Sequence, residues 1–214
     1  LLIITFLSFG QDDYVAQSQR NSEKTIPSQS NDCNSLTNFG DIKICFPNIL
    51  GMTECYSDPL VKYASDMFKG SNQEIILGFY LTDDIYKSRY NDFFENGVGD
   101  EYIKIYSMES IKGVPADEST IELLSSNIKP MFDNYNETLK TMIDSRSNNL
   151  PIDVSFDRPI LLEEYQISPK IKSFVLLTSF DVEDENYIQT AVINIILIKN
   201  RIVFYAYYDV YNGL

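Results

Sequence analysis

The residues with the most suggestive spacing lie near the end of the chain, in the segment FYAYYDVY at positions 204–211. Side chains of a strand alternate between its two faces, so Tyr205, Tyr207 and Tyr211 share one face. The preceding segment 193–198 is apolar on both faces. Apolar strands of this kind are usually covered on both sides, which is the simpler interpretation. The alternative is that this tyrosine face binds a protein or small ligand, because Tyr is favoured at interfaces.

Two pairs of adjacent carboxylates, Asp83-Asp84 and Glu163-Glu164, could in principle serve glycoside hydrolysis. That chemistry needs two carboxyl groups about 5 to 9.5 Å apart across a cleft. Adjacent residues on a strand point to opposite faces, which argues against the second pair. The sequence therefore contains no catalytic motif, and we predict no catalytic residue.

An acidic segment at 181–185 invites comparison with calcium-binding loops. The EF-hand template needs Gly at its sixth position and Glu at its twelfth, where this chain has Asn186 and Val192. A solvated turn is the better interpretation. The chain also contains no histidine, which excludes Ser-His-Asp and Cys-His catalysis and the usual zinc sites. We expect neither a metal site nor a cofactor.

The three cysteines are Cys33, Cys45 and Cys55. If the protein is exported, one disulfide can form, and Cys45 with Cys55 is the expected pair because Cys33 falls in a polar tail. The alternative is that all three thiols are reduced. Their spacing fits no metal-binding motif.

The N-terminal segment LLIITFLSFG predicts a signal peptide over residues 1–10, with its basic start missing. The apolar run is about half the roughly 20 residues that a transmembrane helix needs. Residues 11–40 are rich in Ser, Asn and Gln and are expected to form a disordered polar tether. Residues 41–214 then form a single α+β domain that we expect to be truncated at its C-terminus. A secreted or periplasmic location follows, without stable membrane insertion after leader removal.

Hydrophobic periodicity predicts the elements that would position these residues. Strand patterns cover 42–46, 74–81 and 102–108, and helical patterns cover 83–95 and 117–146. Pro130 interrupts the last segment, which is either one helix kinked near Asn127 or two shorter helices. A further helix starts at Ser57-Asp58-Pro59 with Ser57 as its N-cap. Five strand segments follow residue 151, with a tight turn at 199–201. The predicted fold is an antiparallel sheet with a C-terminal meander, covered by helices.

This order of elements resembles the Mog1/PsbP-like α/β/α sandwich. The resemblance is carried by DIKICFPNILGM at 41–52, like the opening strand and proline of that fold, and by TAVINIILIKNRIVFYAYYDVY at 190–211, like its final hairpin. It implies a fold that hosts partner-binding proteins, and it assigns no functional residue here.

Charge and composition narrow the function further. The net charge of −14 argues against nucleic acid as a partner, because phosphate binding needs clustered Lys and Arg. We therefore expect a secreted or periplasmic, non-enzymatic α+β domain that binds a protein or small ligand. The alternative is a hydrolase acting outside the cytoplasm through carboxylates or tyrosines.

Overall fold

The computed structural model describes residues 33, 35–67, 69, 73–96, 101–133, 154–156, 159–182 and 185–211. The helices and strands of this part are, in chain order, β1 (Ser35–Phe39), β2 (Ile42–Phe46), β3 (Met52–Glu54), α2 (Pro59–Met67), β4 (Glu74–Thr82), α3 (Asp83–Asn96), β5 (Glu101–Met108), the 3-10 turn η1 (Glu109–Ile111), α4 (Glu118–Asp133), β6 (Val154–Phe156), β7 (Ile160–Ser168), β8 (Ile171–Val182), β9 (Glu185–Ile198) and β10 (Arg201–Val210).

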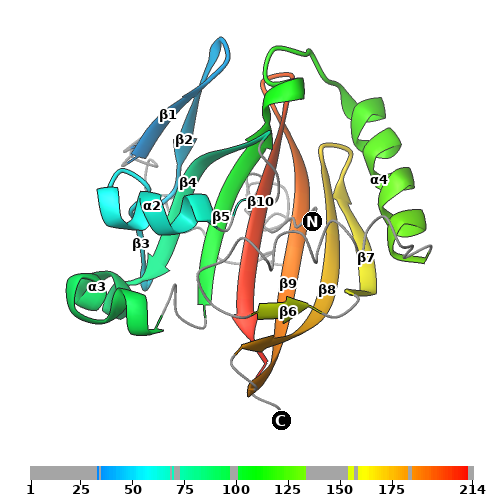
Figure 1. Ribbon diagram of the computed structural model, residues 1–214. Coiled ribbons are helices and arrows are strands. Elements are labelled where there is room, and N and C mark those ends of the chain that lie inside the picture. Colours follow the sequence, from blue (N-terminus) through cyan, green and yellow to red (C-terminus); the bar gives the residue numbers. More distant parts are fainter. Residues whose placement is uncertain are drawn as a thin grey trace, which may run out of the picture.

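One antiparallel sheet dominates the described residues, with the strand order β3-β4-β5-β10-β9-β8-β6 (Figure 1). Strand β7 also pairs with β8, along residues 171–177. The predicted C-terminal meander is therefore confirmed, and pairing of β10 with β5 joins it to the N-terminal strands. The predicted α+β class with an antiparallel sheet is confirmed as well.

The turn between β9 and β10 has the backbone that the sequence predicted. Lys199 has a φ of 47° and Asn200 a φ of 60°. Both values lie in the left-handed region, which two-residue hairpins require and Asn tolerates. The turn sets the register in which Ile198 pairs with Arg201, and this register continues to Val210.

The first face of the sheet is covered by helices. Val61 and Ala64 of α2 and Ile121 and Ile128 of α4 are buried there. They pack with sheet residues that include Phe79, Tyr102, Tyr106, Phe174, Leu176, Ile193, Phe204 and Tyr208. Residues of α3 pack at the border of the same cluster. The expectation that the long helix covers the meander is confirmed, since α4 contacts β7, β8 and β9.

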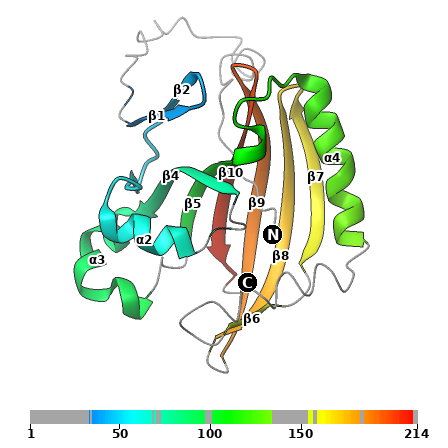
Figure 2. The same ribbon diagram turned by 45° about the horizontal axis from the view of Figure 1, so that its top comes forward.

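The second face of the sheet is covered by the β1–β2 hairpin rather than by a helix, as far as the described residues extend. Phe39, Ile44 and Phe46 of the hairpin are buried against the face, and no residue of α2, α3 or α4 belongs to this cluster. The hairpin lies next to β4, above it in the view of Figure 2. The described residues thus form three layers: helices on the first face, the sheet in the middle and the β1–β2 hairpin on the second face.

Strand β1 corrects the expected extent of the polar tether. Residues 35–39 pair in register with β2, Leu36 opposite Cys45 and Phe39 opposite Ile42. Phe39 is fully buried, which gives this half-polar segment its apolar anchor. The remainder of the expected tether and the expected signal peptide at 1–10 lie outside the described residues.

Two helix ends also differ from the sequence prediction. The cap of α2 is Asp58, not Ser57, because the Asp58 Oδ1 accepts hydrogen bonds from the backbone N–H of Leu60 at 3.0 Å and of Val61 at 3.4 Å. Helix α4 contains Pro130 and continues to Asp133. The rest of the segment predicted as one kinked helix or two shorter ones, 134–146, lies outside the described residues.

Candidate functional site

The tyrosines proposed as a binding face do not form one open surface. Tyr205 is buried at 3% exposure in the second-face cluster, where it pairs with Ile105 of β5 and Asn194 of β9. Burial raises the pKa of its phenol. The simpler interpretation of a hairpin buried on both faces therefore holds at this position.

The other two tyrosines lie further along the chain, toward the end of β10. Tyr207 is half-buried, and its hydroxyl donates to Glu101 Oε1 at 2.9 Å. Tyr211 follows the strand and is 47% exposed. One buried, one half-buried and one exposed tyrosine do not make the flat aromatic platform that the spacing suggested.

The carboxylate pairs do not converge on a cleft. Asp83 accepts a hydrogen bond from Thr53 Oγ1 at 2.7 Å, and Asp84 forms an exposed ion pair with Lys87 at 3.1 Å. Glu163 and Glu164 lie at the opposite edge of the sheet, on β7. Each pair is thus engaged locally, and the two lie on different sides of the molecule (Figure 1).

No group of three metal-ligating side chains occurs in the described part of the chain. Within the acidic turn, Asp181 Oδ1 accepts a hydrogen bond from Asn186 Nδ2 at 2.8 Å, while residues 183 and 184 lie outside the described ranges. In the same described part, no helix is long and apolar enough to span a bilayer.

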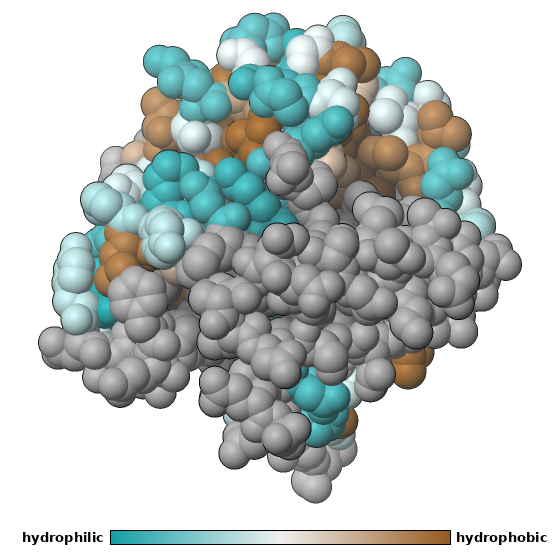
Figure 3. Space-filling model, in the orientation of Figure 1, coloured by the Kyte–Doolittle hydropathy of each residue, from teal (hydrophilic) through white to brown (hydrophobic). Residues whose placement is uncertain are grey.

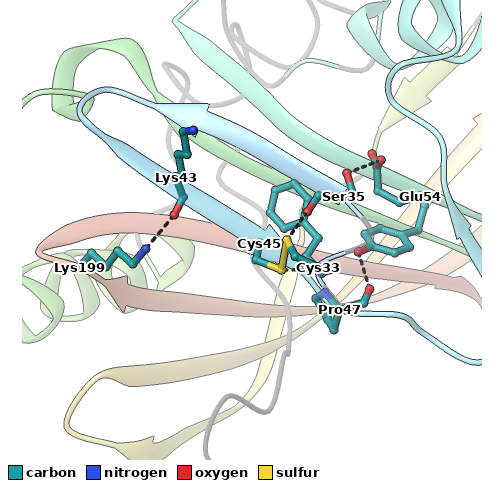
Figure 4. Close-up of a disulfide and its surroundings, with 9 residues drawn as sticks. Cys33, Ser35, Lys43, Cys45, Pro47, Glu54 and Lys199 are labelled. Atoms are coloured by element: carbon teal, nitrogen blue, oxygen red, sulfur yellow. Dashed lines mark hydrogen bonds between the residues drawn. A yellow bond between two sulfur atoms is a disulfide. The ribbon is translucent and has the colours of Figure 1, made fainter. Parts of the chain in front are cut away.

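The cysteine pairing predicted from sequence is wrong. Cys45 is bonded to Cys33, with their Cα atoms 5.5 Å apart, and not to Cys55 (Figure 4). The pairing of β1 with β2 ends with Ser35 opposite Phe46, the residue after Cys45, so that Cys33, two residues before Ser35, lies close to Cys45. Cys55 is a buried free thiol whose Sγ–H donates to the Phe79 carbonyl at 3.3 Å. Structural disulfides are typical of proteins that function outside the cytoplasm.

The feature that the structure adds is the exposed edge formed by β7. This strand pairs with β8 on one side, and no described strand pairs with its other side. Ile160 and residues 162–167 are all exposed. The large apolar side chains among them are Ile160 at 54%, Leu162 at 55%, Tyr165 at 41% and Ile167 at 44%. We call residues 160–168 the β7 edge.

Two bulges shape the β7 edge. Leu161 and Glu163 face consecutive residues of β8, so Leu162 is left out of register. Ile167 is left out in the same way between Gln166 and Ser168. A bulge re-aims a side chain and often protects an edge strand from unwanted pairing. Here both bulged residues are apolar and exposed, which protection alone does not explain.

The charges of the β7 edge are all negative. It contains Glu163 and Glu164 and no Lys or Arg. Glu163 Oε2 accepts a hydrogen bond from the Tyr165 hydroxyl, and this bond raises the pKa of Tyr165. Glu164 lies 3.5 Å from Lys172 Nζ of β8 and is 45% exposed. The edge therefore offers two accessible carboxylates between apolar side chains.

Sequence reasoning identified this segment as a strand but missed its exposure. The signal was present in ILLEEYQIS, whose apolar residues do not alternate as a half-buried strand requires. Other large apolar side chains are also exposed, among them Leu123 of α4 at 64%. In the view of Figure 3, apolar residues stand beside polar ones over the upper part of the molecule.

Comparisons of the chain with family models, with curated proteins and with solved structures found no match. The site must therefore be judged on its own geometry.

Proposed function

We propose that this protein is a non-enzymatic binding domain that works outside the cytoplasm and engages a protein partner through the β7 edge. The observation that carries the proposal is the row of exposed apolar side chains on a strand with one paired side. Edge strands of native proteins normally avoid such exposure, because free backbone groups beside apolar side chains promote association. An edge that keeps them is suited to recognition.

The alternative function, a hydrolase using carboxylates or tyrosines, has less support. Asp83, Asp84 and Glu164 are each engaged with a neighbouring side chain, and the carboxylate pairs do not face each other. A small-ligand site built on Tyr205 is likewise less favoured, because that side chain is buried. A protein partner remains the better proposal.

The location outside the cytoplasm is supported by the Cys33–Cys45 disulfide. Export by an N-terminal signal peptide and a secreted or periplasmic destination are part of this proposal. Likeness to the Mog1/PsbP sandwich is a proposal too, supported by the order of a Pro-ended strand, helices and a final antiparallel hairpin. That fold hosts partner-binding proteins, in agreement with the proposed role.

Site-specific photocrosslinking tests the proposal. A benzophenone amino acid replaces Leu162 in the full chain, expressed in its native cells. A matched variant carries it at Leu50, which is fully exposed just before β3, at the opposite edge of the sheet. We expect a discrete protein adduct from position 162 and none of the same mass from position 50.

The partner is then identified by mass spectrometry and purified. Its binding to the chain should fall at least tenfold on Ile160→Asp or Leu162→Asp and stay unchanged on Leu50→Asp. Equal adducts at both positions, or binding that ignores both β7 substitutions, would overturn the proposal.

A further inference from the structure

The β7 edge has a second property beyond exposure: its backbone is arranged to accept another strand. Between the two bulges, residues 163–166 pair regularly with residues 172–175 of β8. In such a ladder, backbone N–H and C=O groups alternate in direction, so half of those in β7 point away from β8. An extended segment of another protein can pair with these groups and lengthen the sheet.

The side chains on the edge define which extended segment fits. Apolar residues stand at 160, 162 and 167, and two carboxylates lie between them at 163 and 164. A segment that alternates apolar with Lys or Arg residues places its basic residues on one face of the strand, where they can pair with Glu163, and its apolar residues on the other face. The net charge of −14 for the whole chain favours the same kind of partner at long range.

A second copy of this chain fits the edge poorly. Antiparallel pairing of two β7 strands about a two-fold axis at the strand centre sets Glu164 against Glu164. Like charges directly opposite each other destabilise a strand pair. Strand β7 itself contains no basic residue, and Lys172 of β8, 3.5 Å from Glu164 in each copy, would offset only part of this repulsion.

We infer that the partner contributes an extended basic and apolar segment that adds to the sheet as a strand beside β7. This inference rests on the proposed function, since it specifies the partner of the same surface. It explains why the bulged positions hold apolar residues: Leu162 and Ile167 would cover the partner segment at both ends of the regular stretch.

Peptide binding tests the inference with defined probes. The first probe is a labelled nine-residue peptide of alternating Val and Lys, matching the length of β7. The second has the same sequence with N-methyl groups on alternate residues, which removes the donors along one peptide edge. The third alternates Val and Glu. Binding to the full chain is measured by fluorescence anisotropy at physiological salt.

We expect the Val-Lys peptide to bind and the N-methylated peptide to bind at least tenfold more weakly, because main-chain hydrogen bonds provide much of the affinity. The Val-Glu peptide should not bind. Glu163→Gln should weaken the Val-Lys peptide about two- to fivefold, as expected for one exposed charge pair. Asp84→Asn removes the same charge from the start of α3, near the edge of the sheet opposite β7, and should have no effect.

Four results would overturn the inference, and three of them come from the peptide experiments. These are equal binding of the N-methylated peptide, equal effects of Glu163→Gln and Asp84→Asn, and no binding of any peptide. The first two would show attraction by charge alone. If crosslinking at Leu162 yields a partner while the peptides fail, the partner docks without adding a strand, and the proposed function stands without this inference. Dimerisation of the chain that Leu162→Asp abolishes would also overturn it, by identifying a second copy as the occupant.

Discussion

The Lys104 ammonium lies 2.9 Å from the Glu74 carboxylate in the core between the sheet and its helices. The side chain of Lys104 is 5% exposed and that of Glu74 is 2% exposed. They connect neighbouring strands β5 and β4, and the Tyr106 ring lies 4.8 Å from the Lys104 Nζ. A buried ion pair offsets a large desolvation cost only while both charges are present.

We predict that breaking this pair is far more harmful than removing it. Lys104→Met takes the ammonium from beside a buried carboxylate and should lower the free energy of unfolding by about 3–5 kcal/mol. The double variant Glu74→Met/Lys104→Met should recover most of this loss, since two apolar side chains replace two buried charges. Urea denaturation of the singles and the double measures both effects.

The exposed pair Lys87–Asp84 is the matched control for this experiment. Its side chains are 72% and 96% exposed, so Lys87→Met should have an effect below about 1 kcal/mol. Additive losses from Glu74→Met and Lys104→Met would show that the two buried side chains do not depend on each other.

The disulfide gives a second prediction. Peptide mapping without reduction should recover Cys33 linked to Cys45 and Cys55 unlinked. Cys33→Ser should lower the free energy of unfolding by about 2–4 kcal/mol, because the bond closes a short loop in the unfolded chain. Cys55→Ala should leave the bond intact.

The remaining thiol should resist alkylation in the folded protein. Burial raises the pKa of Cys55 to about 12, so almost no thiolate is present at neutral pH. Iodoacetamide should modify Cys55 only after denaturant is added. Rapid modification of Cys55 under native conditions would contradict its burial against Phe79.

Local pattern predicted most elements of this fold, since period two and period 3.6 are visible in single segments. The turn at Lys199-Asn200 was predictable because few residues tolerate left-handed backbone. The pairing of strands that are far apart in sequence could not be predicted from local pattern. Ser107 donates to the carbonyl of Ile202 across the β5–β10 pair, 95 residues away in sequence, and no local signal fixes such a contact.

The candidate site was less predictable than the fold for a similar reason. A strand pattern in residues 160–168 does not tell whether the strand lies at an edge or in the centre of a sheet. The position of β7 depends on β8 pairing with β9 on its other side. Likewise, the Cys33–Cys45 bond depends on β1, whose half-polar sequence gave only a weak strand pattern.

Alkaline pH should unfold the protein through its buried tyrosines. Burial raises the pKa of Tyr102 and of Tyr208 above the ordinary value of 10.0. Both phenols are neutral in either state below pH 10, so stability is fully retained there. Above pH 10 the unfolded chain ionises first, and stability falls as the pH rises toward the folded pKa values.

We expect phenolate absorbance and loss of far-ultraviolet circular dichroism to appear together above about pH 10. Tyr208→Phe should move the unfolding midpoint to higher pH, because one buried group no longer titrates. Tyr63→Phe, at a 61% exposed position, should leave the midpoint unchanged. Ionisation of all tyrosines near pH 10 without loss of structure would contradict their burial.

The contact between the β1–β2 hairpin and the sheet gives the last prediction. A Cβ at Gly78 of β4 would lie 2.8 Å from Cε2 of the Phe46 ring, inside van der Waals contact. Gly78→Ala should therefore push the hairpin outward and lower the free energy of unfolding by about 1–3 kcal/mol. Phe46→Leu should itself be destabilising, but in combination with Gly78→Ala it should cost less than the sum of the two. A double-mutant cycle from urea denaturation measures this coupling.

Gly51→Ala is the control for this cycle. Its added Cβ meets no neighbour, so the variant is strained only by its φ of 80° and should show no coupling to Phe46→Leu. Additive effects at Gly78 and Phe46 would mean that the hairpin does not rest on β4 as described.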